Sequence, residues 1–194
     1  MESVRSRQAR EKLLHAIIFF TKNTNRCFKT KLFKLLYFLD FGIYRETGKT
    51  VTRLQYFAWP QGPVPRDLFE ELKSPKQDLT AAVVLREADL ADPDEYDGRL
   101  RFTPRKGFDQ SLFTARELRI MAALAEIYRD ATASQMVEVT HLVGQPWHQI
   151  FEVDKRQQAL IPYELALDSE PGSITREQAD LIAGEAREGA ALFE

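Results

Sequence analysis

The segment from Lys29 to Arg45 is apolar around nearly its whole circumference, and this feature constrains the fold more than any other. Its sequence is KTKLFKLLYFLDFGIYR, and the spacing of its apolar residues predicts one continuous helix. A helix that is apolar on all sides is covered by its neighbours, because a surface helix keeps a polar face. We therefore expect a central helix with other elements packed around it, ending at Gly48.

The rest of the chain predicts a mainly helical α+β fold, a single domain of about six to eight helices with a small antiparallel β element. Capping-box patterns at Thr114–Glu117 and Thr132–Gln135 mark the starts of two helices. Clusters of β-branched and aromatic residues predict strands near residues 51–58, 81–87 and 98–103. The last two would pair as a hairpin.

The length of 194 residues suits one ordinary domain. We expect residues 10–170 to form it, and residues 171–194 to form a helical tail that packs on the domain or extends from it. The densest apolar run, Leu32–Tyr44, is shorter than the roughly 20 residues that cross a membrane. Cys27 is the only cysteine and no signal-peptide pattern follows the start, so we expect a cytoplasmic protein.

The formal net charge of -2 hides an asymmetry. Residues 1–34 carry nine basic side chains against two acidic ones, a balance of +7. Residues 85–98 carry six acidic side chains and one arginine. A basic end is typical of a solvated helix face, and also of contact with nucleic acid or an acidic partner.

No set of residues predicts catalysis or a cofactor. His141 and His148 lie on either side of a Gly-Gln-Pro-Trp break, which is weak evidence for a metal site that needs three or four ligands. Cys27 has no signature that pairs it with a base, and phosphate-binding glycine loops are absent from the sequence. We therefore expect no catalytic residue, no metal and no cofactor.

Asp40 is the polar residue that stands out in the central helix. A carboxylate among aromatic and leucine side chains must reach solvent or find donors, because an unpaired buried charge is costly. It could form an acidic spot at a binding surface, or it could cap backbone amides of a neighbouring loop, such as the one after Trp59. Both interpretations remain open at this stage.

Residues 56–65, YFAWPQGPVP, crowd aromatic residues and prolines into one short stretch. We expect a strand that ends at Trp59, a turn through Gly62, and a helix that starts at Pro65. Trp59 and Trp147 would fill the core or contact a partner. No nucleophile, base or ligand cluster surrounds this stretch.

Three sequence blocks, taken together, resemble the Panacea domain family of SocA-like antitoxins. They are KLFKLLYFLDFGIYRETGK, YFAWPQGPVPRDLFEEL and ASQMVEVTHLVGQPW, and they span roughly residues 10–155 in the family's order. The residues that match are Lys31, Lys34, Leu35, Leu36, Tyr37, Phe38 and Asp40, then Ala58, Trp59, Gly62, Pro63, Val64, Pro65, Leu68 and Phe69, and finally Ser134, Thr140, His141, Pro146 and Trp147. Gln61 departs from the family, which often has an aromatic residue there.

The resemblance implies a non-catalytic antitoxin that binds and neutralises a protein toxin encoded nearby, in a system linked to phage defence. One branch of the family hands its toxin to a cytoplasmic AAA+ protease, so a role as a proteolytic adaptor is implied as well. The residues expected to contact the partner are Tyr37, Asp40, Trp59, Gln61, Gly62, Pro63, Val64, Arg66 and Glu70. Those expected to hold the structural motif are Pro65, Thr140, His141, Pro146 and Trp147.

A nucleic-acid-binding regulator of the winged-helix type is the alternative. Helices with a two-stranded hairpin could compose such a unit, and the basic N-terminal end would favour it. Six acidic residues at the tip of the would-be wing argue against it, because they would repel phosphate. Nucleic acid is therefore an unlikely partner, and the oligomeric state is left open.

Overall fold

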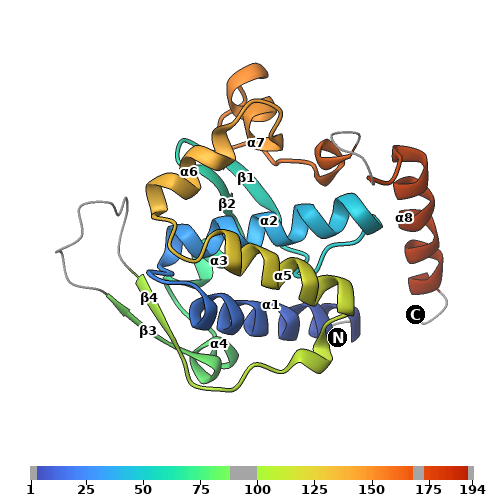
Figure 1. Ribbon diagram of the computed structural model, residues 1–194. Coiled ribbons are helices and arrows are strands. Elements are labelled where there is room, and N and C mark those ends of the chain that lie inside the picture. The colour runs from blue at the N-terminus through green and yellow to red at the C-terminus, as the bar shows by residue number, and fades with distance from the viewer. Residues whose placement is uncertain (1–3, 88–99, 168–172, 192–194) are drawn as a thin grey trace.

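The computed structural model describes residues 4–87, 100–167 and 173–191. A long helix, α2, runs through the middle of the molecule, and the other elements pack around it (Figure 1). The longer helices are α1 (Val4–Asn23), α2 (Lys29–Thr47), α5 (Ala115–Ile127), α6 (Ala133–His141) and α8 (Arg176–Ala191). The short ones are α3 (Arg66–Glu71), α4 (Gln77–Ala82) and α7 (Pro146–His148).

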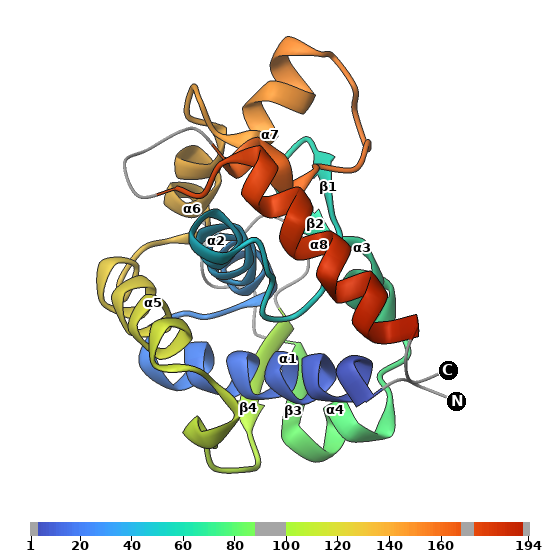
Figure 2. The ribbon, with the colours of Figure 1, turned by 90° about the vertical axis from the view of Figure 1, so that its right-hand side faces the viewer.

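The central helix confirms the strongest sequence prediction. Figure 2 looks nearly along α2, which lies among α1, α5 and α6 on one side and a β-hairpin on the other. Most of its side chains are buried, including Leu32, Leu35, Leu36 and Leu39. Gly48 ends it as predicted, with φ at 65° and its N–H hydrogen-bonded to the carbonyl of Tyr44 at 2.7 Å.

The first hairpin differs from the predicted strand and turn. Strand β1 (Tyr56–Trp59) pairs antiparallel with β2 (Gly62–Pro65), so the prolines do not end the β structure. Residues 51–55, predicted as strand, form a loop. Proline is tolerated in an edge strand, where a missing N–H interrupts no ladder on the far side. The hairpin turns at Pro60 and Gln61, and Gly62 begins the second strand.

The second hairpin was predicted correctly in outline. Strands β3 (Val83–Glu87) and β4 (Leu100–Pro104) pair antiparallel, with Val83 opposite Pro104. Residues 81 and 82 belong to α4, which the sequence did not predict. Most of the acidic stretch lies in 88–99, outside the described residues.

Both predicted capping boxes are present. The Thr114 hydroxyl accepts from the N–H of Glu117, whose carboxylate accepts from the N–H of Thr114, and α5 begins there. Thr132 and Gln135 form the same reciprocal pair at the start of α6. Both pairs satisfy amides that a helix start leaves without partners.

The C-terminal helix α8 lies across the end of α2 (Figure 2). The N–H of Ile174 donates to the carbonyl of Arg45 at 2.9 Å, and a Cβ on Gly48 would come within 3.0–3.2 Å of the side chains of Ile174 and Ile182. Ile174 and Ile182 therefore lie next to Gly48, at the end of α2. Among the described residues, no helix is long and apolar enough to span a membrane.

Candidate functional site

A buried lysine holds the β1–β2 hairpin on α2. Lys34 is 1% exposed, and its Nζ donates a 2.9 Å hydrogen bond to the carbonyl of Pro63. Gly62 has φ at 94°, and a Cβ there would lie 2.8 Å from Lys34 Nζ and 2.7 Å from Thr140 Oγ1. Only glycine permits this close approach. Burial away from water lowers the pKa of Lys34 to about 7.

The segment around α7 holds the hairpin from its other side. The Trp147 indole is buried, and its Nε1 donates to the carbonyl of Trp59 at 2.9 Å. The His141 ring stacks on Trp147, with ring centres 3.7 Å apart. Burial, and then the positive charge of Lys34, lower the pKa of His141. Thr140 and Pro146 are buried next to these rings, so this sequence block lies against the hairpin.

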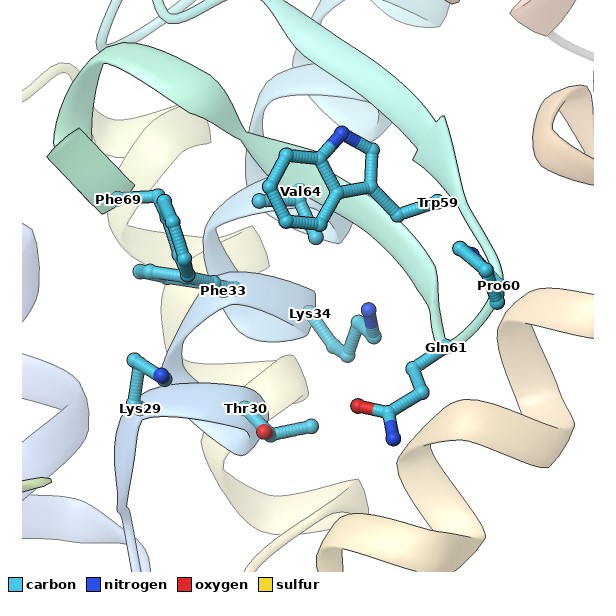
Figure 3. A pocket seen from close by; sticks show the side chains of 9 residues that line it. All are labelled: Lys29, Thr30, Phe33, Lys34, Trp59, Pro60, Gln61, Val64 and Phe69. Carbon is cyan, nitrogen blue, oxygen red and sulfur yellow. The ribbon is translucent and has the colours of Figure 1, made fainter. Parts of the chain in front are cut away.

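Between the start of α2, the hairpin and α3 lies a pocket of about 290 Å³. Figure 3 shows the aromatic side chains of Trp59, Phe69 and Phe33 on one side of it and the polar side chains of Thr30 and Gln61 on the other. The lining residues are Lys29, Thr30, Phe33, Lys34, Trp59, Pro60, Gln61, Val64 and Phe69. We call this the hairpin pocket.

Two lysine ammonium groups lie near the aromatic wall of the hairpin pocket. The Lys29 ammonium lies 5.1 Å from the centre of the Phe69 ring, and the Lys73 ammonium lies 4.9 Å from it. Two lysines and no acidic residue line the pocket. Glu70 on α3 pairs with Lys73 at 2.6 Å, so the charge of Lys73 is partly neutralised. The lining of the pocket is therefore aromatic, with two lysines and no carboxylate.

The structure brings together only part of the predicted contact set. Trp59, Gln61 and Val64 line the hairpin pocket, and Gly62 and Pro63 lie buried beside it. Arg66 and Glu70 are exposed on α3, where the Arg66 guanidinium lies 4.1 Å from the centre of the Phe57 ring. Pro65 is buried at the start of α3.

Tyr37 and Asp40 were expected to contact the partner, but the structure buries both side chains. They are 1% and 0% exposed, because both face the core of the domain. The Asp40 carboxylate accepts hydrogen bonds at 2.8 Å from the amides of Val51 and Thr52, at 2.9 Å from the Tyr56 hydroxyl, and from the Thr52 hydroxyl. It therefore caps the loop before β1, not the loop after Trp59 and not a surface.

The Asp40 site is fully enclosed. Burial raises the pKa of Asp40 to about 6, although the four donors favour the carboxylate form. The Tyr37 ring packs 4.3 Å from Phe41 and 5.5 Å from Tyr56, centre to centre. These side chains pack against one another in the core around the second half of α2.

In a comparison with known families, the model of the antitoxin SocA-like, Panacea domain family matches residues 32–148. That span is more than half of the 194 residues. The chain belongs to the SocA-like Panacea domain family. Comparisons with curated proteins and with solved structures gave no match. The matched span contains the β1–β2 hairpin, the α7 segment and all of the hairpin pocket except Lys29 and Thr30.

Several basic side chains near the start of this Panacea domain bind carboxylates or backbone carbonyls of the protein itself. Arg10 binds the carboxylates of Glu71 and Asp78, with its closest contacts at 2.5 and 2.7 Å. Lys31 is 1% exposed, and its Nζ donates to three backbone carbonyls at 2.8–3.0 Å. With Lys34 also buried, the +7 balance of the sequence overstates the charge at the surface.

The described part of the Panacea domain holds no cluster of three or more His, Cys, Asp or Glu side chains placed to bind a metal ion. Cys27 is buried, and burial raises the pKa of its thiol to about 11. A thiol with such a pKa is a poor nucleophile at neutral pH. The His141 ring stacks on Trp147, and its buried Nε2 has no hydrogen-bond partner within the described residues.

Several residues that line the hairpin pocket were not predicted as site residues: Lys29, Thr30, Phe33, Lys34, Pro60 and Phe69. One signal was available for Lys34. A lysine inside an all-apolar helix raises the same question as Asp40, namely where its charge finds partners. Lys29 and Phe33 are four residues apart, as are Thr30 and Lys34. Side chains at this spacing are neighbours on the surface of a helix.

Proposed function

We propose that this Panacea domain neutralises a cognate protein toxin by binding it directly, without catalysing a reaction. The observation that carries the proposal is the hairpin pocket, which lies almost wholly inside the span matched to an antitoxin family. Aromatic pockets of this kind anchor protein interfaces, because a few buried aromatic contacts supply most of the binding energy. The partner would be encoded by a neighbouring gene and meet the domain in the cytoplasm.

The exposed residues around the pocket would form the rest of the contact surface. Trp59 and Gln61 stand at its rim, while Arg66 and Glu70 extend from α3. The hairpin beneath them is tied to α2 through Pro63 and to α7 through the Trp59 carbonyl. A surface that is already rigid loses little entropy on binding, which favours high affinity.

Co-expression with the protein encoded beside this gene tests the proposal. We expect the neighbouring protein to stop growth alone, growth to return when both are made, and the two proteins to co-purify. Phe69→Ala should weaken the rescue, whereas Ile127→Ala, at a 69% exposed position on α5, should not. A harmless neighbour, or a toxic one that neither binds nor is neutralised, would contradict the proposal.

The level of the toxin separates direct neutralisation from an adaptor role. A direct neutraliser leaves its toxin abundant in a stable complex, whereas an adaptor for a AAA+ protease lowers the amount of toxin. Immunoblots of the co-expressed toxin over time, in cells with and without the protease, distinguish the two. We expect a stable complex.

Duplex DNA binding at low and moderate salt tests the nucleic-acid alternative. A regulator would bind below micromolar concentration with steep salt dependence. The internal use of Arg10, Lys31 and Lys34 argues for weak binding instead.

A further inference from the structure

Strand β3 forms an open edge of the second hairpin. Its partner β4 packs against α1 and α2 and also bridges to Phe28, whereas β3 lies on the outer side of the pair (Figure 1). The N–H of Arg105 donates to the carbonyl of Ala82 at 2.8 Å, and this bond sets the phase of the ladder. Since hydrogen-bonded pairs alternate along an antiparallel ladder, the amides and carbonyls of Val84 and Arg86 point toward β4.

The backbone groups of Val83, Leu85 and Glu87 therefore point away from β4. The N–H of Val83 confirms this direction, because it donates to the carbonyl of Leu79 in α4. Within the described residues, the N–H and the carbonyl of Leu85 have no backbone partner. An extended chain laid along this edge would pair with them, as happens when a peptide adds a strand to an open sheet.

The exposed face of the hairpin favours an acidic chain. Arg86 and Arg101 stand directly opposite each other, and both side chains are exposed. No carboxylate of the described residues pairs with either of them, and the guanidinium of Arg101 lies 5.3 Å from the centre of the Phe28 ring. Like charges directly opposite each other on a sheet are destabilising, so a carboxylate beside these two would be favourable.

The inner face of the hairpin favours an apolar side chain. Leu85 packs on the hydrophobic core, and Phe102 opposite it is buried. In an added strand, the residue opposite Leu85 would lie on that face, and the next residue would lie beside Arg86. A second copy of β3 fits poorly, since antiparallel pairing about Leu85 would bring Arg86 and Arg101 of both copies onto one face.

Resting on the proposed function, we propose that the outer edge of β3 receives an extended acidic segment of the toxin, which adds to the hairpin as a third strand. Its backbone pairs with Leu85, an apolar side chain lies next to Leu85, and an acidic side chain lies beside Arg86. This edge adjoins the hairpin pocket, since Phe28 bridges to Arg101 and the following Lys29 lines the pocket.

Capped heptapeptides test this pairing without the toxin. The probes are N-acetyl-Thr-Val-Glu-Val-Glu-Val-Thr-amide, the same peptide with glutamine for both glutamates, and the glutamate peptide with an N-methyl group on its central valine. They are titrated into ¹⁵N-labelled protein, and the readout is the backbone N–H signal of Leu85. We expect the glutamate peptide to shift this signal and the glutamine peptide to bind about fivefold more weakly. The N-methylated peptide lacks the central N–H and should have no effect.

Substitutions at the edge give the matched test on the protein side, followed at the N–H signal of Glu87. Leu85→Pro removes the outward N–H without breaking a bond to β4, so it should abolish binding, whereas Leu85→Val keeps that N–H and should bind. Arg86→Glu should remove the preference for the glutamate peptide over the glutamine peptide. Arg156→Glu, at an exposed position outside the hairpin, should keep it. The far-ultraviolet circular dichroism of all four variants should match that of the wild type.

Each contrary result identifies what fails. Equal binding of the glutamate and glutamine peptides, binding of the N-methylated peptide, or no shift of Leu85 at the highest soluble peptide concentration would overturn the inference. A dimer in sedimentation velocity that Leu85→Pro dissociates would also overturn it, because a second copy would then occupy the edge.

Co-expression separates this inference from the proposed function. Leu85→Pro should retain less toxin in co-purification than Leu85→Val. If wild-type protein neutralises its toxin and Leu85→Pro does so equally well, the antitoxin function stands and the β3 edge is not part of its contact surface. If no neighbouring toxin is neutralised, the function fails, while the peptide titration still decides the chemistry of the edge.

Discussion

Each half of α2 buries one ionisable side chain, and the surroundings of the two side chains differ. Asp40, in the second half, receives four hydrogen bonds and lies in closely packed core. Lys34, in the first half, is as deeply buried, and Pro63 supplies the one hydrogen-bond acceptor recorded for it within the described residues. The hairpin pocket opens beside Lys34, whereas the Asp40 side chain is enclosed by its four donors and is 0% exposed.

We infer from this difference that Asp40 stabilises the fold, whereas Lys34 lies beside a candidate binding site. A buried carboxylate that accepts a hydrogen bond at every acceptor position is stable. Its removal leaves the buried donors without an acceptor, which lowers the stability of the protein. An ammonium group with three donors and one acceptor is costly, and such exceptions gather where function requires them. The comparison therefore predicts large effects on stability at Asp40, and effects at Lys34 that depend on pH.

The largest effect is expected for Asp40→Ala. The change leaves the buried donors of Val51, Thr52 and Tyr56 without an acceptor, so the free energy of unfolding should fall by about 4 kcal/mol. Urea denaturation followed by circular dichroism measures it. Glu138→Ala, at an exposed position of α6, is the control and should change stability little. A loss at Asp40 as small as that of the control would remove the assigned structural role.

The second effect is the pH dependence contributed by Lys34. Burial lowers its pKa from 10.5 to about 7, so between these values the unfolded chain binds a proton that the folded protein does not. The stability of the wild type should therefore fall as the pH falls from about 10.5 to 7, and Lys34→Met should lack that fall, a difference of about 1.4 kcal/mol for each pH unit. Urea denaturation at several pH values measures both proteins.

Lys22→Met serves as the control for this pH dependence, because Lys22 is exposed. It should follow the wild-type curve across the whole range. Parallel curves for the wild type and Lys34→Met would mean that Lys34 is solvated and charged in the folded protein. The contrast between the two halves of α2 would then disappear.

The sequence predicted the fold well where the signal was local. The all-apolar segment gave the central helix, and reciprocal side-chain pairs gave the starts of α5 and α6. It failed where tertiary contacts override local preference. Residues 51–55 have strand-like composition, yet they form a loop because Asp40 captures the amides of Val51 and Thr52. The prolines of β2 suggested a break, yet they pair with β1.

The site was harder to predict than the fold. The sequence located the hairpin, and it placed Trp59, Gln61 and Val64 at the candidate surface, where the pocket is. It could not assign the buried or exposed side of α2, since a helix that is apolar all round has no face marked by polarity. Asp40 was therefore included among the expected contact residues while a capping role stayed open, and Lys34 was not considered as part of the site.

An intermediate effect is expected for Gly62→Ala. The new Cβ would meet Lys34 Nζ at 2.8 Å and Thr140 Oγ1 at 2.7 Å in a left-handed backbone conformation, so stability should fall by about 2 kcal/mol. Gly144→Ala is the matched control, since Gly144 also has a positive φ, 88°, but no heavy atom lies within 4 Å of its Cβ position. Thermal unfolding of both variants isolates the cost of the close approach. Equal losses would show that backbone conformation alone matters at Gly62.

The smallest effect on stability is expected for Arg66→Ala, although its effect on binding should be measurable. The Arg66 guanidinium is exposed and lies 4.1 Å from the centre of the Phe57 ring, a contact that contributes less than about 1 kcal/mol at such a site. If Arg66 belongs to the contact surface, the variant should unfold like the wild type and yet retain less toxin in co-purification. Arg66→Lys keeps the charge, so it should restore much of the retained toxin if charge is what the toxin recognises. Full retention by Arg66→Ala would confine the contact surface to the hairpin side of the pocket.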